Sequence, residues 1–382
     1  MKEITIEQLE LIEKGSYELI DIRDEGLRDY GMIPGALAVD FDGPEDEYKK
    51  AISEIPADKK LIFYCQIGRK SRELDEYPCL EGRDCFSLAE GYIGYVRSKM
   101  TSESEIEEKR LKAEDSIRKK FHKQLFSPFA KACKTYKLIE EGDRIAVCIS
   151  GGKDSMLMAK LFQEIKNHRK VNFELTFLVM DPGYNKENRA LIESNAKALG
   201  IPITIFESDI FDAVDTIEKN PCYLCARMRR GYLYSNAQKL GCNKIALGHH
   251  LNDVIETTVM AMFYSSQLQG MLPKLHSTNF EGMELIRPLY CIREEDILAW
   301  RTYNELEFIQ CACRFTENCS VCDNGGGGSR RQEIKTLIRR LKRDNPQIET
   351  SIFNSIHSVN IETFPGYKKN GSKHTYLEEY DA

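Results

Sequence analysis

Residues 142–166, GDRIAVCISGGKDSMLMAKLFQEIK, decide the fold of the larger part of this chain. GDRIAVCIS reads as a buried strand, a glycine-rich turn follows it, and SMLMAKLFQEIK has helical periodicity. Further along, FELTFLVMD, IPITIFES and NKIALGHH are predicted strands, and ENRALIESNAKALG is a predicted helix. Apolar strands that alternate with helices indicate an α/β protein, whose parallel sheet carries helices on both faces.

The composition sets limits on the class of protein. The chain has 382 residues, of which 42% are hydrophobic and 30% charged, so it can build ordinary cores and is not a disordered chain. It contains no apolar run of the roughly 20 residues that span a bilayer, and MKEITIEQLELIEKG lacks the apolar region of a secretory signal. We therefore expect a cytoplasmic protein with no membrane partner.

The chain divides into four predicted parts. Residues 1–98 read as short alternating strands and helices, and 99–140 form a charge-dense segment expected to be a solvated connecting helix. Residues 141–345 hold the α/β pattern with a cysteine cluster, and 346–382 are a polar tail. Residues 1–100 hold 14 Lys/Arg and 22 Asp/Glu, so the acidity lies in the first part and the remainder can face a polyanion.

The turn after the first strand of the larger part is a candidate phosphate site. It consists of Ser150, Gly151, Gly152, Lys153, Asp154 and Ser155. Backbone N–H groups at a helix N-terminus bind phosphate, and glycines allow close approach. A serine-capped structural turn is the alternative, but a position at the carboxyl end of a parallel strand favours ligand binding.

Thirteen cysteines in a chain with no export signal indicate metal binding or sulfur chemistry. Cys222 and Cys225 form one CxxC pair, and Cys319 and Cys322 form a second, with Cys311 and Cys313 close to it. Two such pairs can hold a structural zinc ion or an iron–sulfur cluster. Cys148, within an apolar strand, is instead expected to be a small buried hydrophobe.

The turn SGGKDS matches the SGGxDS signature of the PP-loop ATP-pyrophosphatases, which are HUP-like proteins that transfer AMP from ATP to an oxygen of the substrate. LGHHLNDVIET, residues 247–257, resembles their GHHxDDxxET element, with Asn252 at the first acidic position. This resemblance implies that the turn, Gly248 and His249 bind ATP with Mg²⁺. It also implies that Lys153 and Asp253 stabilise charge as pyrophosphate leaves.

Four motifs narrow the resemblance. PCYLCARMRRGYLY, LGHHLNDVIETTVMAMFY, KLHS…LIRPLYCIREEDI and NCSVC…SRRQEIKTLIRRL occur in the order typical of the tRNA 2-thiocytidine synthetase (TtcA-like) group. That group replaces a base carbonyl oxygen of tRNA by sulfur, and holds a four-iron cluster on three cysteines. By position, Cys222, Cys225 and Cys319 are then the ligands, with Cys322 as the alternative to Cys319 and zinc as the alternative metal.

The front part resembles a rhodanese domain. Asp21-Ile22-Arg23, GMIPGALAVD and LIFYC follow one another in the rhodanese order, and the last strand delivers Cys65 into Gln66-Ile67-Gly68-Arg69-Lys70-Ser71. Backbone amides in a loop that leads into a helix, with an arginine nearby, favour the thiolate form of Cys65. Such a thiolate can carry a persulfide. The compressed stretch after Ser71, with Pro78 and Cys79, predicts a short active-site helix.

Two basic patches are candidate RNA contacts. Residues 329–343, SRRQEIKTLIRRLKR, contain seven Lys/Arg and one acid, and aliphatics at 334, 337, 338 and 341 mark a buried face. A solvated surface helix is the alternative. The predicted RNA-binding residues are Arg227, Arg229, Arg230, Arg339, Arg340 and Arg343.

The sequence thus predicts an ATP-dependent tRNA sulfurtransferase that receives sulfur on Cys65 from a cysteine desulfurase or another donor. A cytidine is the expected base and uridine the rival. The resemblance also implies that a homodimer can form. The alternatives are a PP-loop enzyme of amidation or ligation with structural zinc, and a zinc-stabilised nucleotide-sensing module without turnover.

Overall fold

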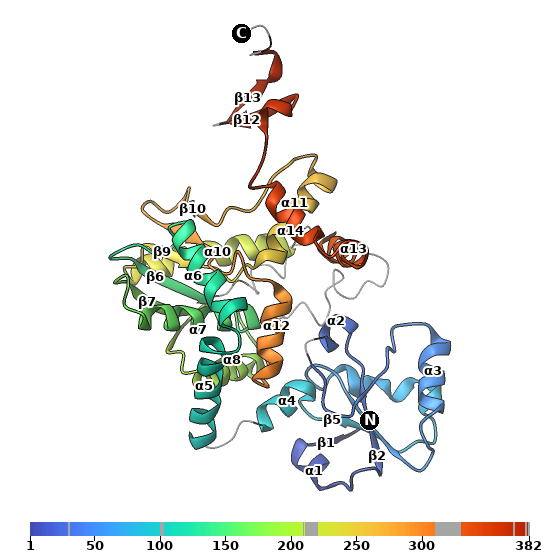
Figure 1. Cartoon of the computed structure of the whole chain (residues 1–382). Coiled ribbons are helices and arrows are strands. Elements are labelled where there is room, and N and C mark those ends of the chain that lie inside the picture. The colour runs from blue at the N-terminus through green and yellow to red at the C-terminus, as the bar shows by residue number, and fades with distance from the viewer. Residues whose placement is uncertain are drawn as a thin grey trace. The chain divides into compact units, whose positions relative to one another are not determined.

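The computed structural model describes residues 1–29, 31–99, 103–208, 210, 221–309, 330–369, 371–378 and 380. The chain forms two compact units, the first from residues 1–250 and 273–326, and the second from 251–272 and 327–382. The first unit holds two separate sheets, and Figure 1 shows each with its helices. No helix of the described residues is long and apolar enough to cross a membrane.

The N-terminal sheet has five strands, all parallel, in the order β1-β5-β4-β2-β3. Its central strand β4 reads KLIFY, and Leu61, Ile62, Phe63 and Tyr64 are all fully buried because parallel strands are covered on both faces. The strands are β1 (Lys2–Ile4), β2 (Tyr17–Asp21), β3 (Leu37–Ala38), β4 (Lys60–Tyr64) and β5 (Cys85–Leu88). The helices are α1 (Ile6–Leu11), α2 (Glu25–Arg28), α3 (Glu45–Ser53) and α4 (Gly91–Ser98), with 3₁₀ helices η1 (Lys70–Glu76) and η2 (Pro78–Leu80).

The second sheet has six strands in the order β10-β11-β9-β6-β7-β8, and only β10 is antiparallel to its neighbour. Its strands are β6 (Arg144–Ile149), β7 (Glu174–Asp181), β8 (Ile203–Glu207), β9 (Lys244–Ala246), β10 (Lys274–His276) and β11 (Glu284–Ile286). The chain order reverses beside β6, whose neighbours are β7 and β9, so this strand end is a topological switch point.

Helices cover both faces of this sheet. Ile145, Val147 and Ile149 of β6 belong to a core that includes buried residues of α7 (Lys153–Asn167), α8 (Lys186–Ala198) and α12 (Glu294–Tyr303). Ala146 and Cys148 of the same strand lie in the opposite core with α10 (Pro221–Lys239). Cys148 is buried in this core, which confirms that it is a small core residue, and burial raises the pKa of its thiol to about 12.

The connecting segment differs from the prediction. It forms α5 (Glu103–Arg118), a π-helical turn (His122–Phe126) and α6 (Ser127–Thr135). The prediction of a solvated helix is wrong for one face, because Ala113, Ile117 and Leu125 are fully buried in the core of the second sheet. Charged residues occupy the outer face of α5, and their density hid the apolar stripe in the sequence pattern.

The second unit contains helices α11 (Leu251–Ser265), α13 (Arg330–Asp344) and α14 (Ile348–Ser355). Ile255 of α11 and Ile334 and Ile338 of α13 form its small buried core. A two-stranded hairpin follows, β12 (Gly366–Lys369) and β13 (Ser372–Thr375), with 3₁₀ turns η5 (Ile361–Thr363) and η6 (Tyr376–Glu378) on either side.

One buried hydroxyl joins α5 to α12 and gives a test of the fold. Ser116 Oγ accepts hydrogen bonds from Trp300 Nε1 at 3.1 Å and from Asn304 Nδ2 at 3.0 Å. Ser116→Ala leaves both buried donors without this acceptor, so we expect about 1–3 kcal/mol of destabilisation. Hydrogen exchange of the α5 and α12 amides measures it. Ser53→Ala, which removes an exposed hydroxyl, is the control and should change stability by less than about 0.5 kcal/mol; equal protection in the two variants would contradict the prediction.

Candidate active sites

The glycine-rich turn at the end of β6 is held by its two serines. The backbone N–H of Ser150 donates to Ser155 Oγ at 3.1 Å, and that hydroxyl in turn donates to Gly152 O at 3.0 Å. The two serine hydroxyls are 3.1 Å apart. Helix α7 begins directly afterwards at Lys153, so the amides of the turn lie at the N-terminus of a fifteen-residue helix.

Gly151 fits the turn for two reasons. Its φ is +84°, a left-handed conformation that residues with a Cβ rarely adopt. A Cβ there would lie 2.7 Å from Ile192 Cγ1, closer than real contacts allow, and 3.0 Å from Ile309 Cδ1, which is also tight. On the other side, a Cβ on Gly248 would lie 3.2 Å from the backbone N of Ser155. The segment after β9 therefore lies directly against the turn after β6.

Charged side chains gather at the same strand ends. Lys153 is only 4% exposed, and its Nζ lies 3.2 Å from Asp154 Oδ2 and 3.4 Å from Glu294 Oε1. His250 Nε2 lies 3.9 Å from the other oxygen of Asp154. The buried ammonium of Lys153 and the amides of Gly151 and Gly152 thus lie together at the N-terminus of a helix. Such an arrangement can bind the oxygens of a polyphosphate.

Glu294 was not among the predicted site residues. It is the first residue of α12 and lies 141 residues from Lys153 in the chain. Glu294, Glu295 and Asp296 belong to the motif LIRPLYCIREEDI, which supported the family resemblance, but by themselves they resemble an ordinary helix start and gave Glu294 no role. A contact of this range cannot be read from local pattern.

The remaining predicted residues of this site lie in different places. Asp253 lies on α11 in the second unit, where Arg331 Nη1 approaches its Oδ1 at 3.2 Å. The role predicted for Asp253 together with Lys153, to stabilise charge as pyrophosphate leaves, therefore stays a prediction. Cys222 and Cys225 lie three residues apart in the first turn of α10. Cys311, Cys313, Cys319 and Cys322 fall outside the described residues.

The N-terminal module places Cys65 directly after β4. The thiol is buried, and Ser71 Oγ donates to its Sγ at 3.6 Å while lying 2.8 Å from Ser87 Oγ. The loop rests on the start of α4, because Tyr92 N donates to Cys65 O at 2.9 Å. Gly91 has a φ of +56°, and a Cβ on it would be 2.3 Å from that carbonyl. The predicted short helix after the loop is the 3₁₀ helix η1.

A buried ion pair supports this loop from behind. Arg23 donates from Nε to Asp21 Oδ1 at 2.9 Å, and Tyr64 donates its hydroxyl to Asp21 Oδ2 at 2.8 Å. The guanidinium lies over the ring of Tyr92 at 3.8 Å and reaches Gln66 Oε1 at 3.4 Å. Arg23 therefore fixes the position of the loop residue next to Cys65.

Tyr92 also contacts a residue of the part of the first unit that carries the six-stranded sheet. Its hydroxyl donates to Glu307 Oε2 at 2.8 Å, and Arg301 Nη2 donates to the same oxygen at 2.5 Å. Burial raises the pKa of Glu307 above its ordinary value. Two residues further on, Ile309 packs beside Gly151. The three residues 307–309 thus connect Tyr92 to the glycine-rich turn.

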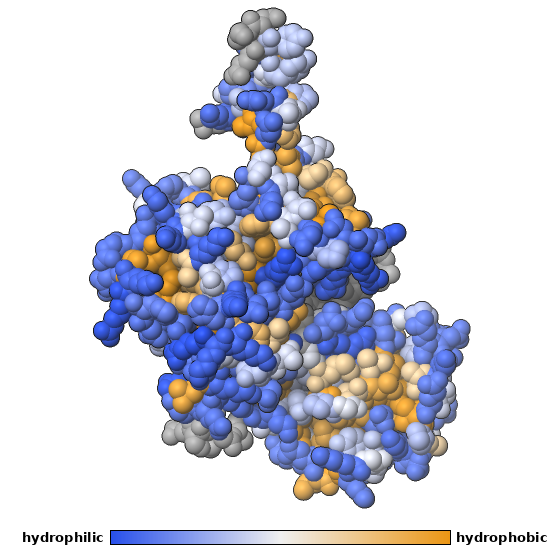
Figure 2. Space-filling view, in the orientation of Figure 1, coloured by the Kyte–Doolittle hydropathy of each residue, from blue (hydrophilic) through white to orange (hydrophobic). Residues whose placement is uncertain are grey.

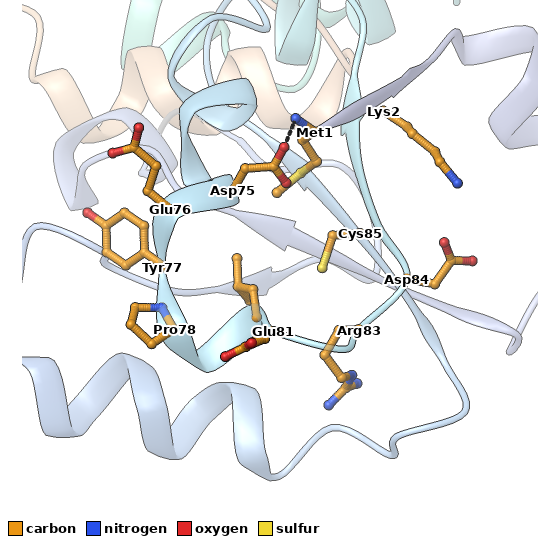
Figure 3. Close-up of a pocket in the computed structure, with 11 residues that line it drawn as sticks. Met1, Lys2, Asp75, Glu76, Tyr77, Pro78, Glu81, Arg83, Asp84 and Cys85 are labelled. Carbon is orange, nitrogen blue, oxygen red and sulfur yellow. Dashed lines mark hydrogen bonds and ion pairs between the residues drawn. The ribbon is translucent and has the colours of Figure 1, made fainter.

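A separate pocket of about 740 Å³ lies on the N-terminal module (Figure 3). Figure 3 shows the amino group of Met1 paired with Asp75 at its edge, and Cys85 among its lining residues. Burial raises the pKa of the Cys85 thiol to about 11. Cys65 is not among the lining residues, so this pocket is distinct from the Cys65 loop.

The two predicted basic patches lie on helices. Arg227 and Arg230 are exposed on α10, and Arg229 Nη2 donates to Tyr184 Oη at 3.4 Å. On α13, Arg339, Arg340 and Arg343 are exposed on the side opposite to the buried Ile334 and Ile338, and Figure 2 shows hydrophilic surface over this helix. Leu341, placed on the apolar face by the sequence pattern, is 39% exposed.

Comparison with known families identifies the class of protein. A PP-loop domain model matches residues 117–314, and a rhodanese-like domain model matches residues 6–98. The chain is therefore a PP-loop protein with an N-terminal rhodanese-like domain, which confirms the predicted fold class.

Curated relatives identify the family. A tRNA-cytidine(32) 2-sulfurtransferase of Citrifermentans bemidjiense is 35% identical over 234 residues, 60% of this chain and 88% of that protein. The enzyme of the same name from Photobacterium profundum is 36% identical over 249 residues, 63% of this chain and 77% of that protein. This chain belongs to the tRNA-cytidine(32) 2-sulfurtransferase family, as its motifs predicted.

Among solved structures, the U34-tRNA thiolase NcsA from Methanococcus maripaludis with its [4Fe-4S] cluster is 22% identical with a TM-score of 0.48. That match covers 64% of this chain and 80% of NcsA.

The two glycines of the turn give a prediction with an internal control. Gly151→Ala introduces a strained φ and a clash with Ile192, so we expect about 1–3 kcal/mol of destabilisation together with loss of ATP affinity. Gly152→Ala should leave stability almost unchanged, because the nearest atoms to its Cβ are 3.6 Å away, but should still weaken ATP binding, because the added Cβ obstructs a phosphate that approaches the amide. Thermal unfolding and ATP titration of both variants measure this, and equal stability of the two would contradict it.

Proposed function

We propose that this chain is an ATP-dependent tRNA sulfurtransferase that replaces the C2 oxygen of a cytidine by sulfur. The curated relatives at 33–36% identity carry the name of this activity. The single observation that carries the proposal is the turn 150–155 at the switch point beside β6, with Gly248 packed against it and Lys153 buried within it. This arrangement suits a nucleoside triphosphate.

ATP serves to make the base oxygen a leaving group. The C2 oxygen attacks the α-phosphorus of ATP, the bond to the β-phosphate oxygen breaks, and pyrophosphate leaves. The amides of Gly151 and Gly152 bind phosphate oxygens, and Lys153 neutralises the charge that grows on the leaving group. Mg²⁺ bound to the phosphates, with Asp154 or Asp253 as an oxygen ligand, would share that role.

The second step exchanges oxygen for sulfur. A sulfide-level nucleophile attacks C2, and the C–O bond breaks with release of AMP, so one sulfur enters and one oxygen leaves on AMP. No redox change of the base is needed. The adenylated oxygen leaves readily, whereas oxide or hydroxide would not.

The cysteines fit an iron–sulfur cluster. Cys222 and Cys225 lie in one helical turn of α10, and thiolates are the ligands that iron–sulfur clusters require. Together with Cys319, or with Cys322, they make a three-cysteine set. A [4Fe–4S] cluster held in this way would supply an iron with an open position for sulfide. Zinc is the rival metal for the same thiolates.

Sulfur delivery is assigned to the N-terminal module. Cys65 accepts the outer sulfur of a donor persulfide, from a cysteine desulfurase or a similar protein, and the donor leaves as its thiolate; the Ser71 hydroxyl lies at the reacting atom. A thiol reductant then attacks Sγ of Cys65, and the disulfide that forms accounts for the two electrons that release the outer sulfur as sulfide. Attachment to the same chain raises the effective concentration of that persulfide for the PP-loop module. The hydrogen bond between Tyr92 and Glu307 supports transfer within one chain.

The decisive experiment uses anaerobically purified protein with unmodified tRNA, ATP, Mg²⁺ and sulfide. We expect 2-thiocytidine in the tRNA digest by mass spectrometry, and iron and sulfide in the protein. Lys153→Met should lower the rate at least a hundredfold, because it removes a preorganised charge from the leaving group. Lys166→Met, an exposed lysine on the same helix, is the matched control and should retain the rate. Thiolated uridine would correct the base, and a zinc-only protein that puts no sulfur into RNA would refute the proposal.

Cys65 is tested separately. Cys65→Ala should abolish thiosulfate:cyanide sulfur transfer, since no persulfide can form, while tRNA thiolation with free sulfide continues. Cys79→Ala, which changes a half-buried thiol in the same module, is the control and should keep the transfer activity. Unchanged transfer by the Cys65 variant would remove the persulfide role.

A further inference from the structure

The C-terminal hairpin is a feature that the family match does not explain. Among the strands that the structure describes, β12 and β13 pair only with each other, and they lie beyond residue 314, where the PP-loop match ends. A single two-stranded hairpin is at best marginally stable in water. Its exposed side chains are therefore candidates for a contact with a partner.

One face of the hairpin carries like charges in register. Lys368 lies directly opposite Lys373, and both are exposed, as is Lys369. Opposed like charges destabilise an antiparallel pair. Within the described part of the chain, none of the three lysines forms an ion pair with a carboxylate. The nearest acid along the chain, Glu378, instead accepts from Thr375 N at 3.0 Å and contacts His374 Nδ1 at 3.1 Å.

Aromatic rings accompany these lysines. Tyr367 and His374 form the neighbouring cross-strand pair and stack with centroids 4.9 Å apart at 19°. Tyr376 and Tyr380, just after β13, are 52% and 71% exposed and meet edge to face at 5.9 Å. Figure 2 shows mainly hydrophilic surface over the hairpin. Lysines with exposed aromatic rings are the combination that binds phosphate and stacks on unpaired bases.

We propose that the hairpin 366–375, with Tyr376 and Tyr380, is an RNA-binding element that contacts the tRNA substrate. Lys368 and Lys373 neutralise adjacent phosphates, which removes the repulsion between them, and the tyrosines stack on unpaired bases. This inference rests on the proposed function, because it names where that substrate is held. An acidic protein surface would match the lysines, but RNA is the favoured occupant because it offers regularly spaced phosphates to the lysines and unpaired bases to the exposed tyrosines together.

The test is tRNA binding by the full-length chain at several salt concentrations. Lys368→Glu/Lys373→Glu should weaken binding at least tenfold near 0.1 M salt and lower the slope of log K against log salt by about 1.5–2, because two phosphate contacts are lost. Lys14→Glu/Lys50→Glu makes the same charge change at exposed positions of the rhodanese-like module and should leave the slope within about 0.5. Tyr376→Ala/Tyr380→Ala should weaken binding with an unchanged slope, since stacking releases no ions.

The milder Lys368→Gln/Lys373→Gln variant guards against failure of the hairpin to form, and should show about the same loss of slope. Wild-type affinity and slope in both lysine variants would overturn the inference while leaving tRNA thiolation untouched. Wild-type tRNA binding together with a loss of sulfur transfer from a donor protein would also overturn it, since the hairpin would then be a protein contact. Absence of thiolation in the wild type would instead count against the proposed function.

Discussion

The backbone at Gly151 is the constraint on which the larger module depends. It must pass through a left-handed conformation in a gap bounded by Ile192 and Ile309, while two serine hydroxyls fix the residues on either side. Only a residue without a Cβ meets both demands. Ile192 of α8 and Ile309 both pack against Gly151. The amides of Gly152 and Lys153 are therefore held in one arrangement before any ligand binds. Preorganisation of this kind is what makes dipoles effective in stabilising charge.

Residues 307–309 connect the glycine-rich turn to the Cys65 loop. Ile309 touches the glycine-rich turn, and Glu307 receives the hydroxyl of Tyr92, whose own N–H holds the carbonyl of Cys65. The Cys65 loop is in turn braced by the buried pair of Asp21 and Arg23. The Cys65 loop and the glycine-rich turn thus lie on separate sheets and are linked through the buried Tyr92 and Ile309 and the half-buried Glu307.

The sequence pattern predicted those elements that depend on interactions between residues close together in the chain. The strand, turn and helix around Gly151 follow from periodicity over some twenty residues, and so does the strand that delivers Cys65. Glu294 escaped prediction because its partner Lys153 is distant in the chain. The buried face of α5 escaped because the hydrophobic residues are spaced thinly among charges, and tertiary packing decides which side they cover. The C-terminal hairpin escaped because lysines opposite lysines do not resemble a stable sheet.

Connectivity of the second unit has a consequence for how the chain matures. α11 is synthesised before its packing partners. The residues that cover Leu251, Ile255 and Val259 come from α13 and α14, about seventy residues later. Until those helices leave the ribosome, an apolar stripe stays open to water, and closing it requires a long-range contact that forms slowly. The PP-loop match ends at residue 314, but this position is not a folding boundary. A chain that ended there would expose the apolar face of α11, which would favour aggregation.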